Sequence, residues 1–170
     1  MTSKSLSFWR VLLVTMAACS GQTDGGPSED IAAKWQQYCE KESSRTTACG
    51  SMPNAGCADD AACMQSVLRA GVVDSLTSCM LRTCGTSDDA CFSMAAAPYQ
   101  SDATVSEYTT TCLNKRETCM QKGMSFSNDI CSNAGLLRSE VVQELRTCVD
   151  GDCAAIDDCY QRVGRSHGCN

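Results

Sequence analysis

The chain has 170 residues, of which 15 are cysteine and one is histidine, and its formal net charge is −6 at pH 7. Residues 1–18 carry Lys4, Arg10 and no acid, so the rest of the chain has 12 basic and 20 acidic residues and a net charge of −8. This acidic balance, with no basic run longer than Lys115-Arg116, argues against binding to nucleic acid or to anionic lipid surfaces.

The N-terminal residues have the three parts of a secretory signal. Met1 to Arg10 is positively charged, Val11 to Ala18 is apolar, and Cys19 follows two alanines. A membrane span needs roughly 20 apolar residues, so this shorter run predicts an export signal instead. Met16-Ala17-Ala18-Cys19 resembles a bacterial lipobox, in which a small residue precedes the cysteine that receives the lipid. The resemblance implies that residues 1–18 are a lipoprotein signal peptide and that Cys19 is the lipidation site.

Cysteine parity supports lipidation, because removal of Cys19 leaves 14 cysteines, an even number that can pair completely. The alternative is ordinary cleavage after Ala18, which leaves Cys19 as a free or paired thiol. Residues 19–28 are small, polar and Gly-rich, which predicts a flexible tether. Ser20 resembles the outer-membrane default of lipoprotein sorting. We therefore expect a lipid-anchored protein of the cell envelope, on the periplasmic or surface face of the outer membrane.

The remaining cysteines are expected to pair in an oxidising compartment and to compensate for a thin apolar core. Each disulfide typically contributes about 2–4 kcal/mol. No C-x-x-C occurs, which argues against thioredoxin-like redox motifs, zinc ribbons and c-type haem attachment, and we expect no cofactor and no metal. The predicted disulfide cysteines are Cys39, Cys49, Cys57, Cys63, Cys79, Cys84, Cys91, Cys112, Cys119, Cys131, Cys148, Cys153, Cys159 and Cys169.

The helical elements are predicted from apolar spacing, in chain order. Ser28 can cap a first helix, and a further helix is expected from about Val105 to Lys122. Asp150-Gly151 ends one helix and Asp152 can start the next. Cys148 and Cys153 would face about 140° apart on one helix, so we expect them on two helices with different partners. The apolar faces comprise Ile31, Trp35, Tyr38 and Cys39, then Val72, Val73, Leu76 and Cys79, then Val141, Val142, Leu145 and Cys148.

An internal repeat relates Leu68–Phe92 to Leu137–Tyr160. The segments share Leu-Arg, Val-Val, Leu, a cysteine pair five residues apart, and Asp-Asp before a final cysteine and aromatic residue. The fold class predicted is all-α, with two homologous disulfide-stapled bundles of short helices: repeat A over residues 29–98 and repeat B over residues 103–170. The boundary is expected at residues 97–102.

The repeat also predicts how the disulfides are arranged. Cys57 and Cys169 have no counterparts, so the simplest expectation is three bridges with the same connectivity in each repeat, and one Cys57–Cys169 bridge. Six cysteines allow 15 connectivities, and the pairs within a repeat stay open. Cys39, Cys49, Cys63, Cys79, Cys84 and Cys91 align with Cys112, Cys119, Cys131, Cys148, Cys153 and Cys159.

Few residues suggest catalytic chemistry. His167 is the one histidine, and we expect it to lie exposed in a C-terminal tail. The acidic pairs Asp59-Asp60, Asp88-Asp89 and Asp157-Asp158 are expected in first helical turns, where they complement the helix dipole, with calcium binding or glycoside hydrolysis as the alternative. The mature methionines are expected to fill the core or to line an adaptable apolar surface. The equivalent Arg69 and Arg138 are expected to pair with acids.

The lipobox and the paired cysteine repeats together resemble the cysteine-rich lipoproteins of myxobacteria-type genomes. The resemblance implies a compartment and a style of fold, and no established activity. We expect a non-enzymatic binding or structural module with a protein or polymer partner, anchored to the membrane by the N-terminal lipid. One alternative is a carrier of lipids or small apolar molecules, which requires a continuous apolar cavity. The other is a carboxylate-dependent hydrolase, which requires two acids converging in a cleft.

Overall fold

The computed structural model describes residues 30–81, 84, 88–124, 126 and 129–169. Over these residues the protein is helical, and the only extended pairing is one antiparallel bridge between Leu68 and Leu137. The predicted all-α class is confirmed. The expected signal peptide, the whole of the expected tether and the lipidation site Cys19 lie outside the described residues.

The described helices form two halves that follow one another along the chain. The elements of the first half are α1 (Ile31–Ala48), η1 (Cys57–Asp60), α2 (Ala61–Val67), α3 (Val72–Met80), α4 (Asp88–Ala96) and η2 (Ala97–Tyr99). The elements of the second half are α5 (Ala103–Gln121), α6 (Asp129–Ser132), η3 (Ala134–Leu136), α7 (Ser139–Val149), η4 (Cys153–Ala155) and α8 (Ile156–Ser166).

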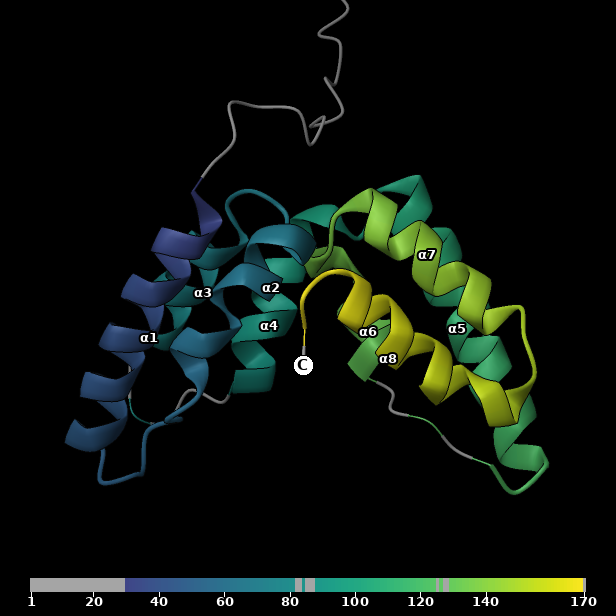
Figure 1. The fold of residues 1–170 in the computed structure, drawn as a ribbon, viewed down its shortest axis with the longest axis horizontal. Coiled ribbons are helices and arrows are strands. Elements are labelled where there is room, and N and C mark those ends of the chain that lie inside the picture. The colour runs from purple at the N-terminus through teal and green to yellow at the C-terminus, as the bar shows by residue number, and fades with distance from the viewer. Residues whose placement is uncertain (1–29, 82–83, 85–87, 125, 127–128, 170) are drawn as a thin grey trace, which may run out of the picture.

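The two halves place their helices in corresponding contacts. In the first half α1 packs on α2 and α3, and α3 packs on α4. In the second half α5 packs on α6 and α7, and α7 packs on α8. Figure 1 shows α1–α4 on one side and α5–α8 on the other, inclined to each other like an arch, with the C-terminus between them.

An aspartate side chain caps the N-terminus of the long first helix in each half. Asp30 accepts a hydrogen bond from the Ala33 amide at 2.9 Å, so the prediction of Ser28 as the N-cap is wrong. A carboxylate directly before the first helical residue can reach an unpaired amide of the first turn, whereas Ser28 lies two residues too early. Asp102 caps α5 in the same way, accepting from the Thr104 amide at 2.9 Å.

The predicted apolar faces are confirmed as the core. In α1 the buried residues are Ile31, Trp35, Tyr38 and Cys39, four positions that recur on one side of a helix. The predicted sets in α3 and α7 are also buried. Together the buried side chains of both halves form one continuous apolar cluster.

The 14 cysteines predicted to pair form seven disulfides. The bridges are Cys39–Cys57, Cys49–Cys84, Cys63–Cys169, Cys79–Cys91, Cys112–Cys131, Cys119–Cys153 and Cys148–Cys159. Such a set is typical of an oxidising, extracytoplasmic environment.

Two bridges have the same connectivity in both halves. Cys49–Cys84 corresponds to Cys119–Cys153, and Cys79–Cys91 corresponds to Cys148–Cys159. Cys148 lies in α7 and Cys153 in η4, and they bond to different partners, as their spacing predicted.

The third pair of each half differs, so the predicted identical connectivity and the predicted Cys57–Cys169 bridge are wrong. Cys112 bonds to Cys131, but its counterpart Cys39 bonds to Cys57. The cause is local, because η1 packs against α1. Cys57 is the first residue of η1, and its Cα atom lies 5.7 Å from the Cα atom of Cys39. Cys63 is thereby available to Cys169, and this bridge joins the two halves.

Candidate functional site

A cavity of about 380 Å³ lies between the two halves, and its wall is almost entirely apolar. Pockets that hold small molecules typically have volumes of about 300–1,000 Å³, so this one is large enough for a small ligand. The described residues around it include no aspartate, glutamate, lysine or arginine. The lining consists of Trp35, Met64, Val67, Leu68, Leu76, Phe92, Ile130, Asn133, Leu136, Leu137, Val141, Leu145, Tyr160, Val163, Gly164, His167 and Cys169.

Much of the lining comes from equivalent positions of the two halves. The pairs include Leu68 with Leu137, Leu76 with Leu145, and Phe92 with Tyr160, all matched by the repeat in the sequence. Leu68 and Leu137 form the antiparallel bridge between the halves. The cavity therefore lies where the two repeats meet, with related walls on either side.

The backbone at this junction is joined by reciprocal hydrogen bonds. The Arg69 amide donates to the Leu136 carbonyl at 3.0 Å, and the Arg138 amide donates to the Val67 carbonyl at 2.9 Å. Residues at matching positions of the sequence repeat thus make the same backbone contact in both directions, as in a two-fold symmetric interface. Two such bonds set the register of the halves beside the cavity.

The side chains of the two arginines brace the same junction. The Arg138 guanidinium donates to the carbonyls of Leu68 and Gln65, both at 2.9 Å. The Arg69 Nε donates to the Leu137 carbonyl. Over the described residues, Arg138 therefore bonds to backbone carbonyls and not to the acid that the sequence led us to expect, because the neighbouring half presents peptide oxygens at this position.

Arg69 is the buried charged side chain at this junction, with 2% of its surface exposed. Its guanidinium forms an ion pair with Asp102 at 3.2 Å and donates to the Ser139 hydroxyl at 3.1 Å. The guanidinium carbon lies 5.0 Å from the centre of the Tyr99 ring, a cation–π contact. Asp102 is also the cap of α5, so one carboxylate links the start of that helix to the junction.

Aromatic residues of each half have their polar atoms satisfied internally. The Trp35 indole nitrogen donates to the Cys57 carbonyl at 2.7 Å. The hydroxyls of Tyr108 and Tyr160 share a hydrogen bond of 3.1 Å. Burial, together with the bond to Tyr160, raises the pKa of Tyr108 far above its usual value of 10.0. Burial also raises the pKa of Tyr160. These groups therefore contribute apolar surface and uncharged hydroxyls to the neighbourhood of the cavity.

Besides Asn133, the polar residue of the wall is His167, which lies in a segment that we call the strap (Gly164–Cys169), formed by the end of α8 and the residues after it. His167 is 18% exposed at its side chain, and its Nε2 lies 3.0 Å from a carboxylate oxygen of Glu144 in α7. The Ser66 hydroxyl in α2 donates to the His167 carbonyl at 2.6 Å. The expectation of an exposed histidine in a free tail is therefore wrong: these contacts fix it against both halves.

The other predicted site residues lie away from the cavity. Asp157 and Asp158 occupy the first turn of α8, and Asp59 and Asp60 lie in η1, consistent with the helix-dipole interpretation. α4 begins at Asp88 and Asp89, which places that pair in a first turn as well. Within the described part of the chain, no group of three potential metal ligands is brought together.

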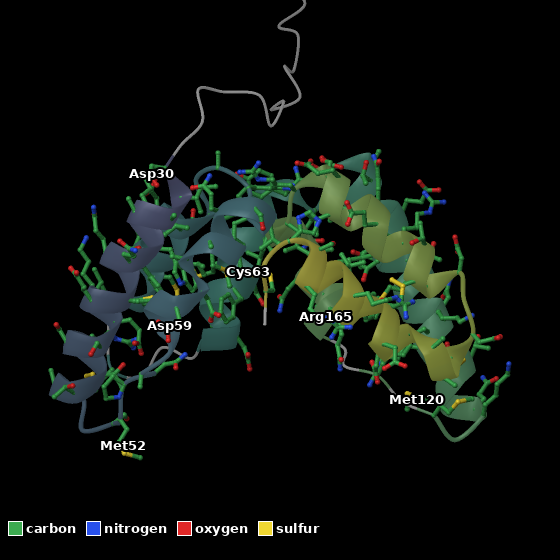
Figure 2. All side chains as sticks on the ribbon, in the orientation of Figure 1. Asp30, Met52, Asp59, Cys63, Met120 and Arg165 are labelled. Carbon is green, nitrogen blue, oxygen red and sulfur yellow. A yellow bond between two sulfur atoms is a disulfide. The ribbon has the colours of Figure 1, made fainter. Side chains whose placement is uncertain are left out.

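The methionines do not form one surface. Met64 lines the cavity and Met80 is buried, whereas Met52 and Met120 are exposed. Figure 2 shows Met52 and Met120 at opposite far ends of the molecule. The cavity itself was missed by sequence reasoning, although the paired apolar positions of the repeat were the signal that could have indicated it.

The chain matches no protein-family model, and comparison with curated proteins and with solved structures gave no match. Over the residues that the structure describes, no helix is both long and apolar enough to cross a membrane.

Proposed function

We propose that this protein binds a small apolar molecule in the cavity between its halves and carries or presents it at the cell envelope. The observation that supports this proposal is the cavity of about 380 Å³ with an almost wholly apolar wall. The sequence alone favoured a binding or structural module with a macromolecular partner. The cavity shifts the balance toward the carrier, because a solid core would have removed that alternative.

Burial of the apolar lining favours binding of a ligand. Met64, Phe92 and Ile130 line the cavity and are only partly buried, so apolar surface faces water when the cavity is empty. Covering such surface is worth about 25 cal/mol for each Å² removed from water. An apolar molecule of matching size gains this energy without breaking hydrogen bonds, since the polar atoms of Trp35 and Tyr160 are already paired.

The alternatives find less support in the geometry. A carboxylate-dependent hydrolase needs two acids that converge in a cleft, and no acid is among the described residues that line the cavity. A docking surface for a protein or polymer would be favoured by a continuous exposed apolar patch. Among the described residues, the large exposed apolar side chains come from several elements, and Met52 and Met120 lie at opposite ends of the arch (Figure 2). The exposed set is Met52, Leu81, Met94, Leu113 and Met120.

Anchoring completes the proposal. A lipid on Cys19, following a signal peptide at residues 1–18, would hold the domain at the membrane through the short tether before α1. The lipobox resemblance and the even number of remaining cysteines support this, as does the oxidising environment that seven disulfides require. A binding domain held there, like the myxobacteria-type lipoproteins that the sequence resembles, could exchange an apolar ligand with the outer membrane or with a neighbouring protein.

The test is binding of an uncharged fluorescent probe, N-phenyl-1-naphthylamine, with and without a side chain that fills the cavity. Val163 in α8 lines the cavity and is half-buried, so Val163→Phe should reduce the space and weaken probe binding at least about tenfold. Gln161→Phe adds an aromatic ring at an exposed position of the same helix and should leave the affinity within about twofold of the wild type.

Native mass spectrometry of the protein purified from its envelope provides a second readout. A bound apolar molecule in the wild type that is lost in Val163→Phe would support the proposal. Failure of the wild type to bind the probe, or equal binding by Val163→Phe, would contradict it.

A further inference from the structure

The strap is held to both halves of the protein at three points. Its last described residue, Cys169, is bonded to Cys63 in α2. The His167 carbonyl accepts from Ser66, also in α2, and the His167 ring contacts Glu144 in α7. Figure 2 shows Cys63 near the middle of the arch, beside the C-terminal end of the chain.

The strap also forms one wall of the cavity, since Gly164, His167 and Cys169 all line it. This wall has no counterpart in the first half. After α4 the chain continues into η2 and on to the second half, whereas after α8 it turns back across to α2. The turn is made by Gly168, whose φ of 79° suits glycine, and by a hydrogen bond of 3.0 Å from the Cys169 amide to the Gly164 carbonyl.

The strap is also the departure from the repeated disulfide pattern. A repeat with identical connectivity would bond Cys63 to Cys39, as Cys131 bonds to Cys112. Instead Cys57 takes Cys39, and Cys63 takes the end of the chain. The two cysteines without counterparts in the repeat, Cys57 and Cys169, do not bond to each other. Their presence results in the Cys63–Cys169 bridge, a covalent link across the cavity wall.

Building on the proposed function, we propose that the strap is the gate of the cavity and that the Cys63–Cys169 bridge limits how fast the ligand enters and leaves. Without this bridge the strap is attached covalently only to α8. Among the described residues, the bonds that still join it to other elements are the hydrogen bond from Ser66 and the contact with the half-exposed Glu144, and single bonds of this kind are individually weak. The freed strap can then swing away from α2 and open the wall.

The test compares probe dissociation in two variants that each lack one bridge. In Cys63→Ser/Cys169→Ser, dissociation of N-phenyl-1-naphthylamine measured by stopped-flow displacement should be at least about tenfold faster than in the wild type. In Cys49→Ser/Cys84→Ser, which removes a bridge whose cysteines do not line the cavity, the rate should stay within about twofold of the wild type. Circular dichroism and intact mass establish that both variants are folded with six bridges.

A folded Cys63→Ser/Cys169→Ser variant that releases the probe at the wild-type rate would overturn the gate while leaving the proposed function intact. Absence of probe binding to the wild type would overturn both. If the double variant does not fold, Cys169→Ala alone removes the bridge and leaves Cys63 in place. It should speed dissociation at least about tenfold, and a wild-type rate in the folded variant would overturn the gate.

Discussion

Replacement of Arg69 by alanine is the sharpest test of how the two halves are held together. The guanidinium is almost completely buried and serves the Leu137 carbonyl, the Asp102 carboxylate and the Ser139 hydroxyl at once. Alanine would leave the Leu137 carbonyl without this donor, at a cost of about 1–3 kcal/mol for a buried polar group.

The loss of the ion pair adds to that cost, but not to its full extent. Removal of one partner of a buried salt bridge typically costs about 3–5 kcal/mol. Asp102 is 30% exposed and keeps its hydrogen bonds to the start of α5, so water and those amides stabilise the remaining carboxylate. We therefore expect Arg69→Ala to lower the free energy of unfolding by roughly 3 kcal/mol.

Arg146 provides a matched control in which the ion pair is shorter but exposed. It contacts Glu107 at 2.7 Å, and the two side chains are 41% and 58% exposed. If burial decides the energy, Arg146→Ala should leave the unfolding midpoint unchanged within error. If the distance between the charged atoms decides the energy, Arg146→Ala should be the more damaging change, because its ion pair is 2.7 Å long and the Arg69–Asp102 pair is 3.2 Å long.

The measurement is equilibrium unfolding in guanidinium chloride without reductant, followed by circular dichroism. Intact mass should first show seven bridges in each variant, so that the comparison concerns Arg69 and not the disulfides. A loss below about 1 kcal/mol for Arg69→Ala, or an equal effect of Arg146→Ala, would refute the view that Arg69 braces the junction by its buried contacts.

Three further outcomes are expected. Gly135→Ala should destabilise the protein by about 1–3 kcal/mol in the same unfolding assay, because the new Cβ would lie 2.7 Å from the carbonyl oxygen of Ala96, the last residue of α4. Gly56→Ala is the control, since the nearest atom to its new Cβ would be 3.8 Å away. The free energy of unfolding should fall as pH rises above about 10, because the pKa values of Tyr108 and Tyr160 are raised in the folded protein and the unfolded chain releases these protons first. Unfolding curves measured on both sides of that pH should show a weaker dependence in Tyr108→Phe. Intact mass of the mature protein should show acyl groups at Cys19, and an unmodified thiol there would contradict the lipid anchor.

Apolar spacing and the repeat were sufficient to predict the helical class and most of the core. Ile31, Trp35 and Tyr38 recur at helical intervals, and all three are buried in α1. The spacing of Cys148 and Cys153 predicted two separate elements for a geometric reason that any helix obeys. These predictions depend on local periodicity, which the sequence carries directly.

The disulfide pairing and the cavity depend on tertiary placement and could not be derived in the same way. Cys57 and Cys63 are both near enough in sequence to reach Cys39, and the choice between them is made by the packing of η1 on α1. The cavity requires two apolar faces that meet without interdigitating fully, and periodicity predicts that a face is buried but not what covers it. The partners of Arg138 were missed for a related reason, because its acceptors are peptide carbonyls that no side-chain pattern reveals.

The strap shows how a repeated fold can acquire a distinct site. The two halves meet through Leu68 and Leu137, and positions matched by the sequence repeat line the cavity from both sides. The two cysteines outside the repeat make the disulfide connectivity of the halves differ, because Cys57 bonds to Cys39 and Cys63 bonds to Cys169. The same bridge closes the longest sequence separation of the seven, 106 residues, so the tie that completes the wall also constrains the unfolded chain most. If the strap is the gate that we propose, this bond contributes to ligand exchange as well as to stability. Only one of the two Cys→Ser variants lacks a bridge at the cavity, and that variant alone should change the rate of exchange.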